Sequence, residues 1–192
     1  MEWDEYRDRI ESAEYRYNVP ALFADGDDFA AFLDDLIGPF DPGDVDQVAG
    51  IDALGFVPGA VLARELDAGF VAVRKGGKLP IDADYRIADT LVDYTGETKT
   101  LELDVRMVPE GSRVLLVDDW METASQMTTA LDLLERAGAD VAGVAVLGAE
   151  ENETPLELEE RYGVHSVRPW HELGGPERAD EERDGGAADG SE

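Results

Sequence analysis

One stretch of this chain, Arg113 to Met127, limits its possible folds more than any other. It reads RVLLVDDWMETASQM, in which four apolar residues, Val114 to Val117, run directly into Asp118 and Asp119. An unbroken run of branched apolar residues is typical of a strand buried on both faces, as in a parallel sheet. Apolar residues at helical spacing follow, and then a second apolar run, Val141 to Leu147. The pattern predicts a strand-helix-strand unit with a right-handed crossover.

The two acids and the turn after them are expected at the ligand-binding edge of that sheet. In open parallel sheets, ligands bind beyond the carboxyl ends of the strands. Helix-start amides just after Asp118 and Asp119 are suited to hold an anion. Thr123 fits a helix N-cap, with Gln126 three residues later able to complete a capping box.

The rest of the chain supplies further strands and helices for one α/β sheet. Val45 to Ile51 reads as a strand leading into DALGF, followed by a helix from about Pro58 to Leu66 and a strand from Phe70 to Val73. Thr100 to Val105 alternates, which indicates an antiparallel or edge strand. A last helix starts at Thr154-Pro155 with a capping box, and the short strand Val164 to Val167 follows it.

The N-terminal part is predicted to be mainly helical. Residues 2–17 have the spacing of an amphipathic helix, and 28–37 that of a second one. Residues 17–23 are expected to be extended, because Pro20 interrupts any helix. Residues 81–98 lack clear periodicity and are expected to form a long loop of the kind that often serves as a lid. The predicted division is an N-terminal helical segment 1–44, a core 45–172, and an acidic disordered tail 173–192.

The charge balance is extreme, with 45 acids against 16 bases and a formal net charge of −29. Self-repulsion of this size destabilises a compact state at low salt, so we infer a salt-loving source whose acids form a solvated coat. Nucleic acid is an unfavourable partner, because its phosphates would meet a repulsive surface. The chain has no cysteine, no segment resembling a signal peptide and no apolar run long enough to cross a membrane. A cytoplasmic protein is expected.

A basic cluster stands out against this acidic background. The segment RKGGKLP, Arg74 to Pro80, holds three of the 16 basic residues within five positions. A solvated turn between strands is the plain interpretation. Basic side chains beside flexible glycines also suit phosphate binding, and we favour an anion clamp.

Three segments together resemble one known family. FVPGAVLARELDAGFVAVRKGGKLP, TLELD and RVLLVDDWMETASQM are similar to the type I phosphoribosyltransferases, and within them to the adenine or xanthine enzymes. The resemblance covers about residues 45–148. It implies a parallel sheet flanked by helices, a lid loop, and a hood over the base. It also implies transfer of ribose 5-phosphate from phosphoribosyl pyrophosphate to a purine in salvage, with Mg²⁺, release of pyrophosphate, and a homodimer.

The resemblance assigns roles to individual positions. Asp118 and Asp119 match the acidic pair that contacts the ribose hydroxyls. The 5-phosphate loop corresponds to Glu122, Thr123, Ala124, Ser125 and Gln126. The pyrophosphate side corresponds to the short loop Asp52, Ala53, Leu54 and Gly55, with the basic residues Arg74, Lys75 and Lys78. Tyr94 and Glu102 match common family positions, and the lid corresponds to residues 82–98. Mg²⁺ is implied through the substrate, and no protein ligand to it is assigned.

The chain departs from the family pattern at two places. The usual phosphate loop A-T-G-G-T reads Glu122-Thr123-Ala124-Ser125-Gln126, without either glycine, and Leu54 replaces an arginine. These changes keep open a second hypothesis, a catalytically inactive relative that binds a nucleotide or phosphoribosyl ligand as a sensor. A third, a phospho-acceptor receiver domain, fails because the strand is central and no lysine lies downstream.

Other residues carry little functional signal. The base is left undetermined, because the first 40 residues show no adenine-type recognition motif. Trp120 and Met121 fit packing under a neighbouring loop as well as ligand contact. His165 and His171 are too few for a metal site and are expected to be structural.

Overall fold

A computed structural model describes residues 1–168 except 11, 14–15, 93–95, 122–123 and 150–152. The predicted acidic tail, 173–192, and Tyr94 lie outside these described residues. Within the described part, no helix is long and apolar enough to span a membrane. The division into 1–44, 45–172 and 173–192 stays a proposal.

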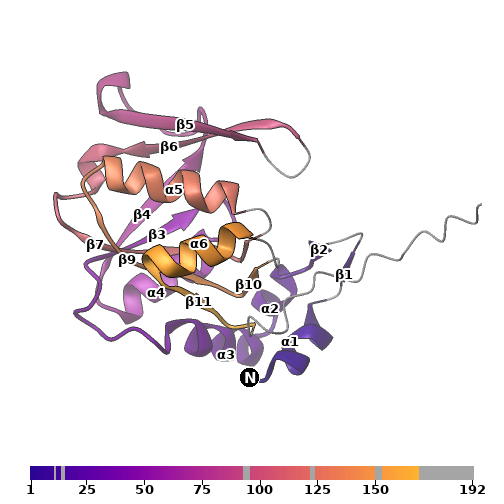
Figure 1. Ribbon diagram of the computed structural model, residues 1–192. Coiled ribbons are helices and arrows are strands. Elements are labelled where there is room, and N and C mark those ends of the chain that lie inside the picture. Colours follow the sequence, from indigo (N-terminus) through magenta and orange to yellow (C-terminus); the bar gives the residue numbers. More distant parts are fainter. Residues whose placement is uncertain (11, 14–15, 93–95, 122–123, 150–152, 169–192) are drawn as a thin grey trace, which may run out of the picture.

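A seven-stranded sheet forms the centre of the molecule, in the order β11-β9-β7-β3-β4-β6-β5 (Figure 1). The first five strands in that order pair in parallel, and β6 and β5 pair antiparallel to complete it. These strands are β3 (Gln47–Ile51), β4 (Gly69–Lys75), β5 (Arg86–Val92), β6 (Thr98–Asp104), β7 (Arg113–Val117), β9 (Asp140–Val146) and β11 (Val164–Ser166). The predicted α/β fold class is confirmed, and β7 lies near the middle of the sheet, as its apolar run indicates.

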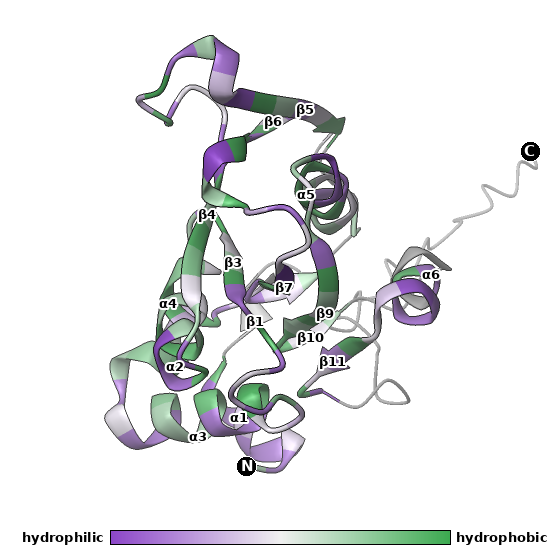
Figure 2. Ribbon diagram, turned by 90° about the vertical axis from the view of Figure 1, so that its left-hand side faces the viewer, coloured by the Kyte–Doolittle hydropathy of each residue, from purple (hydrophilic) through white to green (hydrophobic). Residues whose placement is uncertain are grey.

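Helices cover both faces of the sheet. On one face lie α5 (Ser125–Arg136) and α6 (Glu153–Tyr162); on the other lie α4 (Phe56–Glu65) and α3 (Gly26–Ile37) (Figures 1 and 2). Successive residues of a strand point to opposite faces. On β7, Leu116 therefore packs in the core under α5, whereas Leu115 and Val117 pack in the core under α4. Both cores are apolar along β7 from Val114 to Val117, which explains the unbroken apolar run of these four residues.

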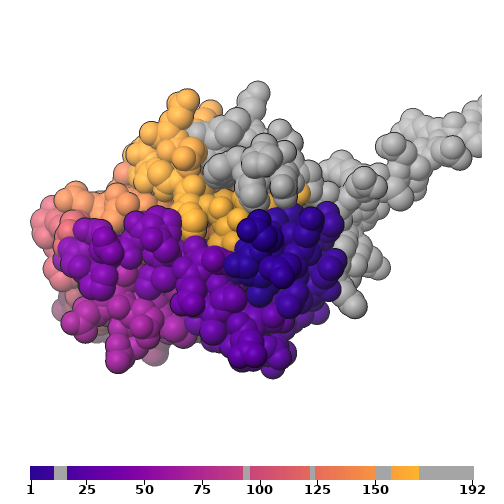
Figure 3. All heavy atoms as spheres, turned by 90° about the horizontal axis from the view of Figure 1, so that it is seen from below, coloured from indigo at the N-terminus to yellow at the C-terminus, as the bar shows by residue number. Residues whose placement is uncertain are grey.

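The N-terminal segment packs on the α4 side of the sheet. It comprises α1 (Trp3–Arg9), the short strands β1 (Ser12–Ala13) and β2 (Arg16–Tyr17), α2 (Pro20–Ala24) and α3. Tyr6, Phe32 and Leu36 are fully buried in the same core as Val48 of β3. In the space-filling view from below, this segment, in indigo and purple, lies beside the C-terminal part of the sheet region in orange (Figure 3).

Two expectations for this segment are wrong. The first helix ends at Arg9, with Ile10 as its C-cap, and does not reach Tyr17, which lies in β2. Residues 17–23 are not extended throughout, because α2 begins at Pro20. Proline is well suited to the first position of a helix, since its fixed φ is helical and its missing N–H has no partner there anyway.

The long loop expected at 81–98 is also wrong over residues 86–92, which form a strand. A single 3₁₀ turn, η1 (Ala83–Tyr85), leads into β5, which pairs with β6 from Arg86–Asp104 to Val92–Thr98. These strands form the arm at the top of Figure 1. The pairing with β6 satisfies the backbone of β5, and Leu91 is buried against the core under α5. Such a strand depends on its partner more than on its own apolar pattern.

Three smaller elements complete the described chain. They are η2 (Val105–Met107), β8 (Trp120–Met121) and β10 (Gly148–Ala149), and β8 pairs in parallel with β10. This pairing extends from the ends of β7 and β9. It holds the segment that follows Asp118 and Asp119 against the sheet.

Candidate active site

The acidic pair lies directly beyond the carboxyl end of β7. Asp118 is 4 % exposed, and its Oδ1 accepts a hydrogen bond from the Asp119 N–H at 3.0 Å. Its Oδ2 accepts one from Gln126 Nε2 of α5, also at 3.0 Å. Burial, followed by the charge of Asp119, raises the pKa of Asp118 well above its ordinary value, although both hydrogen bonds oppose this.

The short loop after β3 lies against this pair because of a glycine. A Cβ added to Gly55 would lie 2.9 Å from Asp118 Oδ1, 2.7 Å from the Val117 carbonyl oxygen and 2.8 Å from the Ile51 N. Two of these three atoms belong to the backbone and cannot move aside cheaply. Gly55 thus allows the predicted pyrophosphate loop, Asp52 to Gly55, to contact the predicted ribose site. The loop contains a cis peptide bond between Asp52 and Ala53.

The predicted 5-phosphate loop is described only from Ala124 onward, since Glu122 and Thr123 lie outside the described residues. Ala124 has φ 55° and ψ −6°, in the left-handed region. This is a conformation that glycine adopts freely, so the chain keeps a glycine-type backbone where the family glycine is lost. Ala124, not Thr123, is the N-cap of α5, and its methyl side chain cannot accept a hydrogen bond. The predicted capping box is therefore wrong, and the Gln126 amide is turned towards Asp118.

The basic cluster lies at the end of β4 and in the turn after it. Arg74 Nε and Lys78 Nζ each lie 3.1 Å from Asp52 Oδ2, and the Lys75 N–H donates to the same oxygen at 3.4 Å. Burial alone would raise the pKa of Asp52, but these hydrogen bonds and charges outweigh it and lower the pKa. The structure therefore joins the predicted basic residues to the predicted pyrophosphate loop.

A second buried acid fixes the turn itself. Glu102 of β6 is 2 % exposed, and its Oε1 accepts hydrogen bonds from the Lys78 and Leu79 N–H groups, both at 2.7 Å. Its Oε2 lies 3.4 Å from Arg86 Nε. Burial opposes the charge, yet the backbone donors and Arg86 leave the pKa of Glu102 lowered. The sequence marks Glu102 only by family resemblance, whereas the structure shows it anchoring the basic turn.

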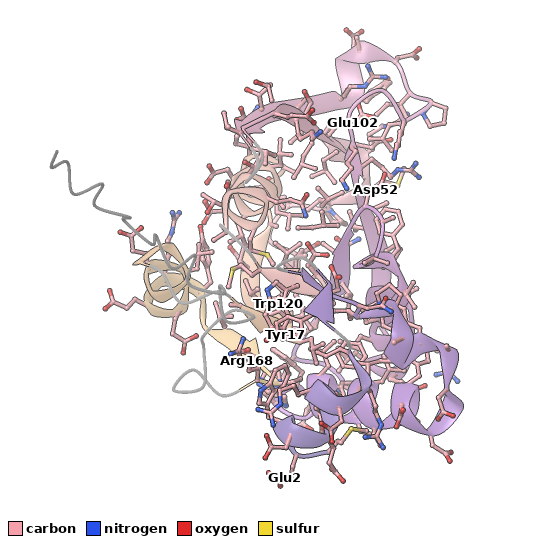
Figure 4. All side chains as sticks on the ribbon, turned by 90° about the vertical axis from the view of Figure 1, so that its right-hand side faces the viewer. Glu2, Tyr17, Asp52, Glu102, Trp120 and Arg168 are labelled. Carbon is pink, nitrogen blue, oxygen red and sulfur yellow. The ribbon has the colours of Figure 1, made fainter. Side chains whose placement is uncertain are left out.

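Aromatic side chains gather at the other end of the site region. Trp120, directly after the acidic pair, lies 4.6 Å from the ring of Tyr17 and 6.3 Å from that of Trp3. The guanidinium of buried Arg168 lies over the Trp3 and Trp120 rings, at 5.1 and 5.7 Å. Figure 4 shows Asp52 and Glu102 towards the β5–β6 arm, and Tyr17, Trp120 and Arg168 together towards the N-terminal helices.

The packing interpretation of Trp120 and Met121 fits this arrangement, since Met121 is buried in the core. The sequence does not predict the role of Arg168, because no motif surrounds this residue. Its contact with the aromatic rings depends on its position just after β11 in the fold. His165 Nε2 lies 2.8 Å from the Asp35 carbonyl oxygen, a structural contact. His171 lies outside the described residues.

Comparison with known proteins agrees with this geometry. The sequence profile of the phosphoribosyl transferase domain matches residues 16–181. The chain belongs to the phosphoribosyltransferase family. An adenine phosphoribosyltransferase of Xanthomonas oryzae pv. oryzae (strain PXO99A) is 42 % identical over 130 residues, which is 68 % of each chain. The corresponding protein of Methylorubrum extorquens (strain PA1) is 38 % identical over 124 residues, 65 % of this chain and 66 % of that one.

A solved structure confirms the type I phosphoribosyltransferase fold. The adenine phosphoribosyltransferase of Rhodothermus marinus DSM 4252 superposes with a TM-score of 0.74 at 30 % identity, covering 85 % of this chain and 96 % of that one. The family prediction from the three sequence segments is thus confirmed.

Proposed function

We propose that this phosphoribosyltransferase transfers ribose 5-phosphate from phosphoribosyl pyrophosphate to a purine, with adenine as the first candidate, and releases pyrophosphate. The main observation in support is the contact of Gly55 with Asp118. It places the loop that begins at Asp52 against the acidic pair, and Asp52 forms ion pairs with Arg74 and Lys78. The site therefore presents cations and carboxylates side by side. The adenine phosphoribosyltransferases named above support the purine class.

The chemistry explains why both charges are needed. As the bond from the sugar to pyrophosphate breaks, positive charge develops on the ribose and negative charge on the leaving group. Carboxylates at Asp118 and Asp119 stabilise the first, and the cations of Arg74, Lys75 and Lys78 stabilise the second. Ala124, Ser125 and Gln126 lie at the N-terminus of α5, and a helix N-terminus suits the 5-phosphate. We extend this assignment to Glu122 and Thr123 as a proposal from the sequence.

Mg²⁺ fits this donor set when it is held mainly by the substrate. Mg²⁺ prefers oxygen ligands and is often bound through one or two carboxylates together with substrate phosphates. Among the described residues, no three acidic or histidine side chains converge on one point. Asp118 and Asp119 are the carboxylates next to the ribose, and bound Mg²⁺ would supply neutralisation of pyrophosphate charge.

We propose that the base lies beside Trp120, under the N-terminal segment. Trp120 directly follows the acidic pair, is partly exposed, and is held by Tyr17. A flat indole is suited to stack on a purine ring.

A homodimer is also proposed, through the face formed by α4 and β4. Val57 and Phe70 are 38 % and 39 % exposed there, and Phe56 packs between Phe70 and Arg74. This apolar face continues into the basic cluster, so a second copy bound there would lie next to the site. Light scattering of the wild type and of Phe70→Asp tests it, and a wild-type monomer would contradict it.

The function is tested by calorimetric titration with phosphoribosyl pyrophosphate and Mg²⁺ in molar salt. Binding by the wild type and its loss in Asp118→Asn/Asp119→Asn establish the site. A pyrophosphate-release screen over purine and pyrimidine bases then identifies the acceptor. Binding without turnover on any base would support the sensor alternative, for which Leu54 is the described feature in favour. A well-folded wild type that does not bind would refute both.

A further inference from the structure

Gln126 has a role that its position in the phosphate loop does not suggest. By sequence it is a phosphate-loop residue, expected to donate to a phosphate or to cap α5. In the structure its side-chain Nε2 donates instead to Asp118 Oδ2, at 3.0 Å. We propose that Gln126 is a positioning residue, which holds the buried Asp118 carboxylate towards the ribose and links it to the 5-phosphate loop. This inference rests on the proposed function of the site.

The surroundings of Asp118 make this amide important. Among the residues that the structure describes, the groups facing the carboxylate are Asp119 on its own segment, Gly55 of the β3–α4 turn, and Gln126 of α5. Of these, only Asp119 is titratable, and its charge disfavours a second negative charge. Gly55 packs closely against the Oδ1 side, since a Cβ there would lie 2.9 Å from that oxygen. A buried carboxylate of this kind depends on the donors it has.

The Asp119 N–H and the Gln126 amide both donate to the carboxylate, and these two donors are not equivalent. Oδ1 accepts the N–H of Asp119, a backbone group fixed by the chain itself. Oδ2 accepts a hydrogen bond from Gln126, which stands at the second position of α5, two residues after Ala124 with its left-handed φ. Any movement of the phosphate loop that turns this end of α5 therefore also turns Asp118. The 5-phosphate and the ribose hydroxyls are bound by one connected unit.

The test removes the donor while keeping the length of the side chain. Gln126→Met retains an unbranched chain but cannot donate, so the Asp118 carboxylate loses a hydrogen bond. The acidic limb of the kcat/KM profile for phosphoribosyl pyrophosphate should move up by about one pH unit, as expected for loss of a hydrogen bond to a charged group. The matched control is Gln47→Met, because Gln47 donates to the Met107 carbonyl oxygen far from the acidic pair. Its profile should equal that of the wild type.

A second readout does not depend on turnover. Carboxyl ¹³C chemical shifts of the ligand-free protein are followed against pH, and the Asp118 signal is assigned by its absence in Asp118→Asn. Its midpoint should rise in Gln126→Met and stay unchanged in Gln47→Met. An unchanged midpoint in a Gln126→Met protein of normal melting temperature overturns the proposal. A shifted midpoint in a protein without transferase activity would leave the positioning role standing and refute the proposed function alone.

Discussion

At the scale of single residues, the left-handed Ala124 shows what the divergent phosphate loop has kept. Ala124 is 3 % exposed and lies in a conformation that costs an L-residue about 1–2 kcal/mol. A β-branched side chain tolerates it less, and the buried position adds overpacking of about 1–3 kcal/mol. We expect Ala124→Val to lower the free energy of unfolding by about 2–4 kcal/mol and to weaken phosphoribosyl pyrophosphate binding. Urea denaturation and calorimetry measure both.

The matched control at this position is Ala124→Gly. Relief of the backbone strain is offset by the loss of a buried methyl group, about 0.8 kcal/mol, and by a more flexible unfolded chain, about 0.4–1 kcal/mol. Stability should therefore change little, while binding is retained. Equal stability of Ala124→Val and Ala124→Gly would show that the left-handed backbone is not required.

Asp118 illustrates a second residue-scale effect, in which the proposed function opposes stability. Its pKa is raised in the folded state, so folding favours the protonated form. Stability is therefore present at low pH and is lost as pH rises from the unfolded pKa to the folded one. Each unit of this shift corresponds to about 1.4 kcal/mol. Asp118→Asn should have a higher Tm than the wild type at neutral pH, by at least a few degrees, and should lose substrate binding.

The pH dependence distinguishes this explanation from a general packing effect. The difference in Tm between Asp118→Asn and the wild type should shrink as the pH is lowered towards 4, because the wild-type carboxyl becomes neutral too. Thermal scans across pH measure it. A difference that is constant with pH would show that ionisation of Asp118 is not its cause.

At the scale of elements, two buried acids hold the basic turn to the sheet from two strands. Asp52 follows β3 and binds Arg74 and Lys78, while Glu102 of β6 accepts the turn's backbone N–H groups. Removing Glu102 breaks its two hydrogen bonds from the turn, and a hydrogen bond to a charged group contributes about 1.5–3 kcal/mol. Glu102→Ala should lower stability by about 2–4 kcal/mol and weaken pyrophosphate binding by about tenfold or more. Asp104→Ala is the control, since Asp104 ends the same strand but pairs with Arg106.

The two variants are compared by pyrophosphate titration and thermal melting. Asp104→Ala should lose stability without losing pyrophosphate affinity. Equal affinity in Glu102→Ala and the wild type would contradict the role of Glu102 in fixing the turn.

The sequence predicts an element well when the element is stabilised by its own apolar residues, and poorly when it depends on a partner. Elements with their own apolar pattern, such as β7 and α5, are predicted to within a residue or two of their observed start. The strand β5 was missed because it is stabilised by its ladder with β6, and α2 was missed because Pro20 starts a helix instead of breaking one.

The site divides in a similar way. Motif spacing identifies Asp118, Asp119 and the basic cluster. It does not show which acid each cation contacts. It also does not show that the side-chain amide of Gln126 donates to Asp118. These depend on three-dimensional packing, such as the contact of Gly55 with Asp118, which no local pattern encodes.

At the scale of the whole molecule, the net charge of −29 decides how stability depends on salt. The Debye length falls from about 10 Å at 0.1 M to about 3 Å at 1 M salt, so repulsion among surface acids is largely screened by 1 M. Exposed ion pairs, such as those of Arg113 with Asp46 and Arg136 with Asp89, weaken under the same conditions. Each contributes little, at most about 1 kcal/mol, so relief of repulsion should dominate.

We therefore expect the Tm to rise by several degrees or more between about 0.1 M and 1 M KCl, and refolding yield to rise with it. Thermal melting across KCl concentrations tests this, with potassium sulfate at matched ionic strength as the comparison. If screening is the cause, the gain levels off near 1 M and is the same for both salts. A continued rise that is larger in sulfate would assign the effect to stronger apolar burial instead. Full stability and refolding in dilute buffer would refute the inference of a salt-loving source, because the acidic coat would then carry no cost that salt needs to relieve.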